Sequence, residues 1–274
     1  MGPDAESSAT PEELQYPRTR GIESLHRHDG YILFAVKSSD GILTHLASIR
    51  RSQLDSLFPL FRERLEKDSY VAINASWRET SSLNRSKLAL RKYHSADTLK
   101  YLCACYADID YYNKGRTFNQ AFFEVLEAEK EGRIPPASMV IGSGRGMWLL
   151  WLLRDQTNPD QAHNGAWCDN PLNHALLYSE IQREIWRRLA PIGADPQGTD
   201  AVRLVRMEGS FHTGAEKYVR WWIQGQGDGG FTYTLKDLAD FFDIWPSSPE
   251  LRGGHYKQPQ PHHLIPETCQ AAVS

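Results

Sequence analysis

The chain has 274 residues, of which 41% are hydrophobic, and its formal net charge at pH 7 is -3. This length allows one large domain or two small lobes, and the near-neutral charge excludes an overall positive field, so a nucleic acid would have to be bound by a local basic patch. The four cysteines form no CxxC pair and no apolar run approaches the roughly 20 residues that span a bilayer, so we expect a soluble, cytoplasmic protein without a zinc site or a disulfide framework.

Both ends of the chain lack hydrophobic periodicity. Residues 1–22 and 247–274 are rich in Pro, Ser, Gly and charged side chains, a composition typical of flexible tails or linkers. The folded domain is therefore expected to cover residues 23–246. Two pairs of histidines, at 26 and 28 and at 262 and 263, are predicted to lie in loops and tails, because no Cys or carboxylate completes a ligand set near them.

The first half of the chain predicts two strands and two helical stretches. Residues 30–37 and 69–77 read as strands, and a polar, basic segment, residues 78–100, follows them. Thr117 and Gln120 have the spacing of a capping box, and the helix that they begin should end near Gly132, Pro135 and Pro136. Another helical stretch is predicted between the two strands from Leu54, Leu57, Phe58, Phe61 and Leu65.

The second half begins with a predicted hairpin, because residues 139–142 and 147–153 flank the turn SGRG. Apolar residues at a spacing of four, from Leu177 to Leu189, then predict an amphipathic helix. Residues 201–224 read as a second hairpin, and Thr234 as the N-cap of a short last helix. This mixed order predicts an α+β or α/β fold with a partly antiparallel sheet.

The strand CACYADID, residues 103–110, ends in two carboxylates one residue apart. Strand alternation places Asp108 and Asp110 on one face with Tyr106, opposite the apolar set that begins with Cys103 and Cys105. The two charges repel each other unless a divalent cation lies between them or both are solvated. The pair therefore indicates either a metal site or a strand that ends in a polar loop.

The turn GSGRG, residues 142–146, is a second candidate element. Its glycines leave backbone amides accessible, and Ser143 and Arg145 offer donors to a phosphate. The spacing is not that of a P-loop, and no helix follows as in a dinucleotide-binding motif, so the glycines could equally serve the turn alone.

A third candidate element is the segment of residues 193–214, in which Asp195 and Asp200 precede basic and hydroxyl side chains. Arg203 and Arg206 differ by three positions, so a regular strand would direct them to opposite faces, and they could serve one ligand only across a bulge. The alternative is a surface hairpin with solvated charges.

In this order and spacing, the three elements resemble the archaeo-eukaryotic primase superfamily, in particular primases and primase-polymerases of plasmids and phages, over about residues 26–245. Asn74 lies in a segment, YVAINASW, that also looks like one found before the D-x-D strand in plasmid members. Two residues depart from the pattern: Trp148 stands where many members have His, and Glu208 where Pro is usual. The matching positions are Asp108 and Asp110 in ADID; Ser143, Arg145 and Trp148 in SGRGMW; Ala194 and Asp195; and the stretch RLVRMEGSFHTG.

The resemblance implies an RRM-like catalytic sheet packed with an N-terminal α/β unit. It also implies a template-dependent nucleotidyltransferase that makes or extends primers on single-stranded DNA in plasmid or phage replication. Asp108, Asp110 and Asp195 would hold two ions, Mg²⁺ or Mn²⁺. The residues expected to bind the nucleoside triphosphate are Ser143, Arg145, Trp148, Arg203, Arg206, Ser210 and His212.

The resemblance further implies a single-stranded DNA template as a partner, leaves room for a replicative helicase or initiator, and gives no role to a membrane. Tyr111, Tyr112 and Trp148 could act as stacking platforms for bases. Two other functions fit parts of the pattern: a non-catalytic module that binds single-stranded nucleic acid, and a metal-dependent glycosyltransferase, which also uses a D-x-D pair. The densest basic segment, and thus the expected DNA contact, contains Arg78, Arg85, Lys87, Arg91 and Lys92.

Overall fold

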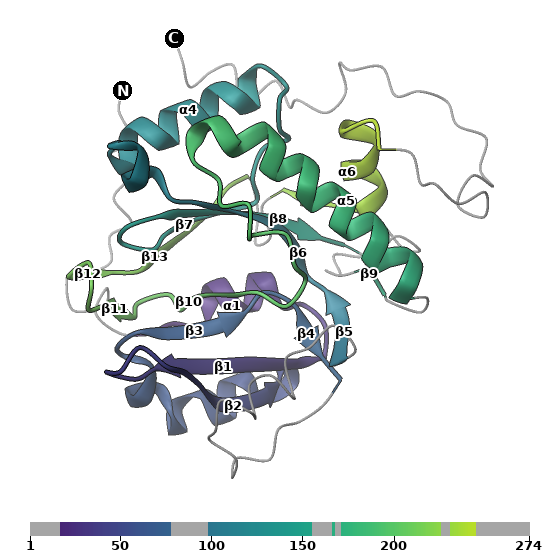
Figure 1. Ribbon diagram of the computed structural model, residues 1–274. Coiled ribbons are helices and arrows are strands. Elements are labelled where there is room, and N and C mark those ends of the chain that lie inside the picture. The colour runs from purple at the N-terminus through teal and green to yellow at the C-terminus, as the bar shows by residue number, and fades with distance from the viewer. Residues whose placement is uncertain (1–16, 78–97, 155–165, 168–170, 226–230, 245–274) are drawn as a thin grey trace. The chain divides into compact units, whose positions relative to one another are not determined.

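The computed structural model describes residues 17–77, 98–154, 166–167, 171–225 and 231–244. The described elements form two β-sheets, one above the other in Figure 1, and a separate two-stranded ribbon. The basic residues from Arg78 to Lys92 and the histidines at 262 and 263 lie outside the described residues. Among the helices that are described, none is both long enough and apolar enough to cross a membrane.

The lower sheet has seven strands in the order β10-β3-β1-β4-β5-β9, with β2 also paired to β1. The apolar run of β1 is buried on both faces, since Ile32 and Phe34 join one core while Leu33 and Ala35 join another. Its strands are β1 (Tyr31–Lys37), β2 (Leu43–Arg50), β3 (Ser69–Ala72), β4 (Ala75–Ser76), β5 (Leu99–Leu102), β9 (Ala166–Trp167) and β10 (Leu204–Arg206).

The upper sheet has five strands, in the order β13-β7-β8-β14 with β6 paired to β8. All seven residues of β8 are buried, as expected for a central strand covered on both faces. The hairpin predicted around the turn SGRG is formed by β7 and β8. The strands are β6 (Ala104–Ile109), β7 (Met139–Gly142), β8 (Met147–Leu153), β13 (Arg220–Ile223) and β14 (Thr232–Tyr233), and the ribbon is β11 (Phe211–His212) with β12 (Lys217–Tyr218).

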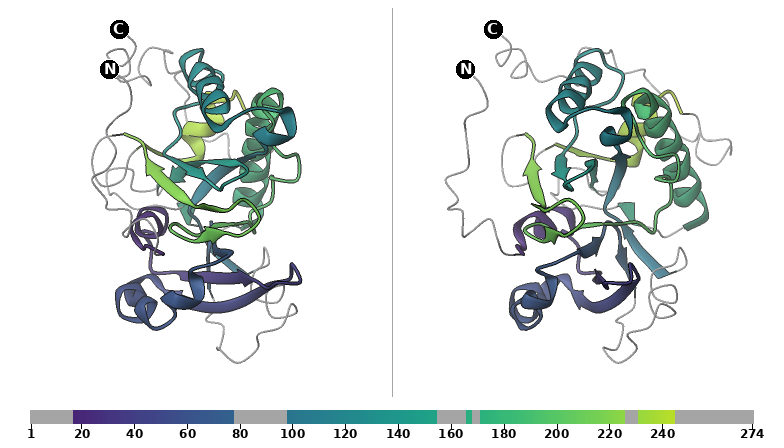
Figure 2. Two further views of the ribbon diagram at one scale, coloured as in Figure 1. Left: turned by 90° about the vertical axis from the view of Figure 1, so that its left-hand side faces the viewer. Right: turned by 60° about the vertical axis from the view of Figure 1, so that its left-hand side comes forward.

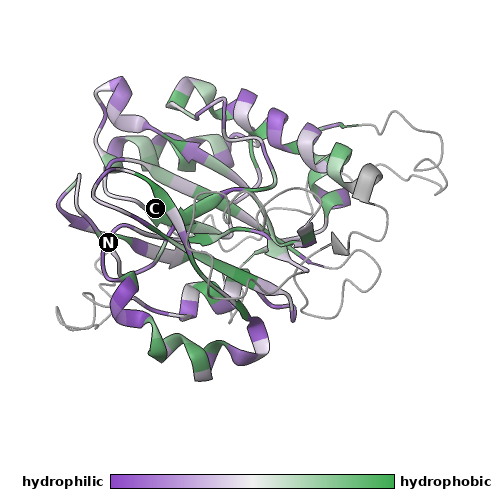
Figure 3. Cartoon of the chain, turned by 60° about the horizontal axis from the view of Figure 1, so that its bottom comes forward, coloured by the Kyte–Doolittle hydropathy of each residue, from purple (hydrophilic) through white to green (hydrophobic). Residues whose placement is uncertain are grey.

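Helices cover the outer face of the upper sheet and fill the space between the sheets. Figures 1 and 2 show α4 (Phe118–Lys130), α5 (Pro171–Leu189) and α6 (Leu235–Phe241) above the upper sheet and α1 (Arg20–Leu25) between the two sheets. The capping boxes of α4 and α6, begun by Thr117 and Thr234, are present. In Figure 3 the strands are mainly green and the helices are banded green and purple, as expected for amphipathic helices on a buried sheet.

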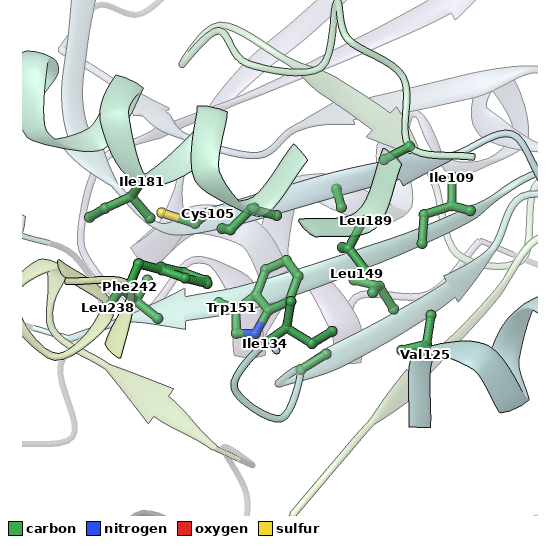
Figure 4. Close-up of a cluster of buried hydrophobic side chains, with 14 of the residues drawn as sticks. Cys105, Ile109, Val125, Ile134, Leu149, Trp151, Ile181, Leu189, Leu238 and Phe242 are labelled. Carbon is green, nitrogen blue, oxygen red and sulfur yellow. The ribbon is translucent and has the colours of Figure 1, made fainter. Parts of the chain in front are cut away.

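Two large hydrophobic cores lie on the two faces of the upper sheet. One core, shown in Figure 4, packs α4, α5 and α6 against Cys105, Ile109, Leu149 and Trp151. The other lies between the sheets and includes α1. Cys103, which precedes β6, belongs to this second core, so the expectation that Cys103 shares a face with Cys105 is wrong.

The mixed α+β class with partly antiparallel sheets is confirmed, but three local predictions differ from the structure. Residues 43–50 form β2, and the predicted helix after it is divided into α2 (Leu54–Leu57) and short 3-10 turns around Pro59. Residues 201–224 contribute to both sheets and to the ribbon instead of forming one hairpin. Residues 20–22 begin α1 and so do not belong to a tail, and His26, which lies in the predicted loop after α1, is completely buried.

Candidate active site

Backbone pairing brings Asp195 to the end of β6. Ile109 and Ala194 form an isolated antiparallel bridge. The Asp110 amide donates to the carbonyl of Gly193 at 3.0 Å, and the Asp195 amide donates to the carbonyl of Asp108 at 2.7 Å. The segment of residues 193–195 therefore acts as a short additional strand and places three carboxylates, from distant parts of the chain, at one end of the upper sheet.

A buried glutamine on α5 holds both carboxylate-bearing segments. The Gln182 side-chain oxygen accepts from the Tyr106 amide at 2.9 Å, and its NH₂ group donates to the carbonyls of Tyr106 at 3.3 Å and Gly198 at 3.4 Å. The Tyr106 hydroxyl donates to the Asp200 carbonyl at 2.8 Å. Because Gln182 is completely buried, these bonds have no competition from water and fix the loop of residues 195–200 against β6.

The carboxylates repel one another strongly. Burial, together with the neighbouring Asp110 and Asp195 charges, raises the pKa of Asp108 to about 7, although Arg203 opposes the shift. Burial and the Asp195 charge also raise the pKa of Asp110. This excess of negative charge is the electrostatic setting in which a cation is bound favourably.

In the structure a guanidinium lies among these carboxylates. Arg203 Nη2 is 3.3 Å from Asp195 Oδ2 and 3.9 Å from Asp108 Oδ2, and its Nη1 is 3.8 Å from Asp200 Oδ2. The guanidinium carbon also lies 5.8 Å from the centre of the Trp148 ring. Arg203 precedes β10, so the strand alternation that would separate it from Arg206 does not apply to it.

Arg206 belongs to a neighbouring polar network. Its Nη1 is 3.0 Å from Asp68 Oδ1, its Nη2 is 2.9 Å from His212 Nε2, and His212 Nδ1 is 2.8 Å from the Ser143 carbonyl. Since an arginine only donates and a carbonyl only accepts, His212 is neutral with its proton on Nδ1. Burial, reinforced by Arg206, lowers the pKa of His212, which agrees with this assignment.

Asp68 was not singled out in the sequence, yet it completes the Arg206 network. The Thr213 hydroxyl donates to Asp68 Oδ2. Burial opposes ionisation, but the hydrogen bonds from Thr213 and Arg206 lower the pKa of Asp68. Its backbone adopts φ 42°, a left-handed conformation that is uncommon for a residue other than Gly. The sequence signal for this conformation was the position of Asp68 just before the strand that begins at residue 69, because Asp tolerates the left-handed conformation in turns.

The turn between β7 and β8 contacts both the carboxylate cluster and the Arg206 network. The Ser143 hydroxyl donates to the Gly146 carbonyl at 3.0 Å and accepts from the Gly146 amide at 3.1 Å, so it stabilises the turn. A side chain at Gly146 would lie 3.1 Å from the Ile109 carbonyl and 3.4 Å from Asp110 Oδ1, which explains a glycine there. Arg145 is exposed and donates to the Gly214 carbonyl.

Two predicted nucleotide contacts face the interior. Trp148 pairs with Asp108 across the strands, stacks on Tyr106 and is only 7% exposed. Ser210 is completely buried, and its hydroxyl accepts from the Ser69 amide at 3.2 Å. Trp148 therefore forms one wall beside Asp108, whereas Ser210 fastens the segment after β10 to β3 and is not placed to contact a nucleotide.

The donor chemistry of the three aspartates fits a hard divalent cation, because Mg²⁺ and Mn²⁺ prefer carboxylate oxygens. Among the described residues, however, no three His, Cys, Asp or Glu side chains are already arranged to hold a metal ion. Arg203, in contact with Asp195 and 3.9 Å from Asp108, supplies the positive charge instead. Metal binding would therefore require the carboxylates to turn from Arg203 toward a common centre.

No protein-family model matches the chain. The chain is 24% identical over 211 residues to a Clostridium perfringens protein described as "Replication protein", and the match covers 74% of this chain and 46% of that protein. The chain thus spans about half the length of the curated relative that it matches.

Solved structures also resemble the chain. The AEP domain (PP-N190) of the cyanophage S-2L primase-polymerase matches with a TM-score of 0.51 and 13% identity, over 83% of this chain and 99% of that domain. Primase RepB' matches with a TM-score of 0.46 and 12% identity, over 82% of this chain and 60% of that one. The likeness to the cyanophage domain, together with the two-sheet architecture, shows that this chain has the archaeo-eukaryotic primase fold.

Proposed function

We propose that the chain is the catalytic domain of a replication primase, a template-dependent nucleotidyltransferase that makes or extends primers on single-stranded DNA of a plasmid or phage. The observation that carries this proposal is the pairing of residues 193–195 with the end of β6, which assembles Asp108, Asp110 and Asp195 in a primase fold. The likeness to a replication protein supports the same process.

The three aspartates are the proposed ligands of two divalent ions, Mg²⁺ or Mn²⁺. When bound, such ions would activate a 3′-hydroxyl and stabilise the pyrophosphate leaving group in nucleotidyl transfer. The chain's own part is to hold these carboxylates close together despite their repulsion, through the backbone pairing and Gln182. A bound cation would relieve that repulsion and would lower the pKa of Asp108.

Cationic and hydrogen-bonding groups around the carboxylates suit the triphosphate. Arg203 and Arg206 offer planar guanidiniums, and the exposed Arg145 lies in the turn between the two groups. His212 is neutral and held by Ser143, so it would act through hydrogen bonding after Arg206 or Ser143 releases a ring nitrogen. No protein nucleophile is needed, because the attacking group belongs to the primer or first nucleotide.

A non-catalytic module that binds single-stranded nucleic acid is the second candidate. It is favoured by one observation, the ion pair between Arg203 and Asp195, which neutralises part of the carboxylate cluster without a metal. The fold gives the glycosyltransferase interpretation no support, since the matched structure is a primase-polymerase domain.

Nucleotide incorporation separates these candidates. Purified protein is given primer-free single-stranded DNA, labelled ribo- or deoxyribonucleotides, and Mg²⁺ or Mn²⁺, beside an Asp108→Ala, Asp110→Ala double variant. The exposed Asp55 of α2, changed to Asn, is the matched control. Products from the wild type and the control, but not from the double variant, support the primase; DNA binding without products from any protein supports the binding module.

A further inference from the structure

An open pocket lies at the edge of the upper sheet, outside the carboxylate cluster. It has a volume of about 250 Å³, and its lining includes Tyr111, Phe118, Lys217, Tyr218, Arg220 and Trp222. Four of these six side chains are aromatic and two are cationic. None of these six side chains is used in the proposed chemistry.

The aromatic floor of the pocket is exposed but held in place. Trp222 is 42% exposed and Tyr218 is 37% exposed. The Trp222 ring packs 5.7 Å from Phe118, and Phe118 packs 6.1 Å from Tyr111. A Cβ atom at Gly142 would lie 3.2 Å from the Trp222 ring, so the indole rests on a bare stretch of backbone. An indole fixed on one side and open on the other is a surface on which a planar base can stack.

Positive charge borders this floor. Lys217 and Arg220 are both exposed, and within the described part of the chain neither forms an ion pair. Arg220 and Trp222 lie two residues apart in β13 and therefore on the same face of the sheet. Their cross-strand partners are Gly142 and Val140 of β7. A phosphate next to a stacked base would therefore meet a cation that has no carboxylate partner.

The pocket and the carboxylates lie at the same end of the upper sheet, on opposite faces. Val140, on the pocket's face, joins the core beneath α4, whereas the cross-strand partner of Asp108, Trp148, joins the core between the sheets. Tyr111 directly follows Asp110 in the chain, and Gly144 of the pocket belongs to the turn whose Gly146 lies beside Asp110. A linear polymer bound in the pocket could therefore reach the carboxylates by passing around this end of the sheet.

We propose that this pocket binds an unpaired base of single-stranded nucleic acid, with Trp222 and Tyr218 stacking on the base and Lys217 and Arg220 contacting the flanking phosphates. The inference rests on the proposed function for the identity of the strand, which would be the template or primer leading to the carboxylates. Charge and ring chemistry together favour this occupant, because bases stack on aromatic rings while their phosphates require cations.

Binding is measured by fluorescence anisotropy with a labelled oligothymidine and with an abasic strand of equal length, in the Asp108→Asn, Asp110→Asn background, which removes synthesis. Trp222→Ala should weaken oligothymidine binding about 5- to 100-fold, the range expected for one stacked base, and should affect the abasic strand much less. Phe123→Ala, an exposed aromatic of α4 at 66% exposure, is the matched control and should bind normally.

A second variant keeps the inference testable if Trp222→Ala fails to fold. The double variant Lys217→Glu, Arg220→Glu changes only exposed charges. Its affinity should depend less on salt, so the negative slope of log affinity against log salt concentration should decrease in magnitude by about 1 to 2. Lys130→Glu, exposed on α4, is its control. The pocket inference is overturned if both pocket variants bind like the wild type, if both strands weaken equally with Trp222→Ala, or if a free mononucleotide or an acidic peptide competes as well as the oligomer.

The two proposals fail separately. A wild-type protein that makes primers while the pocket variants bind DNA normally would contradict the pocket alone. A protein that makes no primers but binds oligothymidine through Trp222 would contradict the primase proposal and leave the pocket in place.

Discussion

Asp195 donates its backbone amide to the carbonyl of Asp108 at 2.7 Å, although 86 residues separate them in the chain. This bond positions a carboxylate from the loop after α5 through main-chain geometry, which side-chain motion does not disturb. The proposed cluster of three carboxylates depends on that juxtaposition.

Gln182 should control how well the carboxylates are positioned. Gln182→Leu removes the hydrogen bonds to Tyr106 and Gly198 and leaves buried backbone groups unpaired, so we expect a loss of about 1–3 kcal/mol in the free energy of unfolding. Nucleotide incorporation should fall more than folded content, because the loop of residues 195–200 loosens first. Urea unfolding and steady-state incorporation give the two readouts, with the exposed Gln53→Leu as control; a purely structural role would lower activity only in proportion to folded protein.

Arg203 should compete with divalent cations. In the wild type, Mg²⁺ or Mn²⁺ is expected to raise the melting temperature and EDTA to reverse this, because a ligand that binds only the folded state stabilises it. Arg203→Gln should enlarge the metal-induced shift, since its guanidinium no longer neutralises Asp195 and Asp108. Thermal unfolding with and without metal measures both. Equal shifts in wild type, Arg203→Gln and the exposed control Arg183→Gln would argue against this competition.

Glu129 gives a pH dependence away from the site. Burial raises the pKa of Glu129 from its ordinary 4.5 to about 7, with the Ala137 amide bond opposing the shift. The folded protein therefore holds this proton more tightly than the unfolded chain does, and the stabilisation is complete below pH 4.5 and lost as the pH rises through 7. Glu129→Gln should be more stable than the wild type at pH 8, by about 1–2 kcal/mol after allowance for partial exposure, and close to it at pH 5.

Urea unfolding at both pH values tests this prediction. Glu127→Gln, on the exposed side of the same helix, should show no such difference between pH 5 and pH 8. An equal effect of both substitutions would mean that burial of Glu129 does not control the pH dependence.

Gly21 and Glu208 should fasten α1 to the sheets. The Gly21 amide donates to Glu208 Oε2 at 3.2 Å, and a Cβ at Gly21 would lie 2.3 Å from the Trp221 ring. Gly21→Ala should therefore destabilise the fold by about 1–3 kcal/mol through overpacking, whereas Arg20→Ala on the exposed side of α1 should have little effect. Glu208→Gln should retain the bond and Glu208→Ala lose it; thermal unfolding that ranks these variants otherwise would contradict this anchoring.

The sequence contained the local signals of the fold but not its long-range pairing. The capping box at Thr117, the N-cap at Thr234 and the glycine turn after β7 depend on neighbouring residues, and all three were predicted. Residues 201–224 were misread because β10 and β13 pair with β3 and β7, far away in the chain, and only the short ribbon of β11 and β12 pairs within the segment. Alternation within one segment cannot show which distant strand it will join.

The candidate site shows the same difference between local features, which the sequence predicts, and long-range contacts, which it does not. Asp108, Asp110 and Asp195 were expected together only through the resemblance to primases, and the structure brings them together by pairing residues 193–195 with β6. Asp68, which directly precedes β3, could not be assigned to Arg206 by spacing, since the two residues are 138 positions apart. Glu208, which departs from the family pattern, proves to bond α1, a contact that depends on tertiary packing.

Primer synthesis on single-stranded DNA by Asp195→Asn and by Asp200→Asn tests whether Asp195 belongs with Asp108 and Asp110. The two aspartates share a loop and both lie near Arg203, but only Asp195 is paired with Asp108 through the backbone. We expect Asp195→Asn to reduce incorporation on the order of 100-fold or more while leaving folding and DNA binding intact, and Asp200→Asn to reduce it by less than about tenfold. Equal losses in the two variants, or full activity in Asp195→Asn, would contradict the assignment of Asp195 to the catalytic carboxylates.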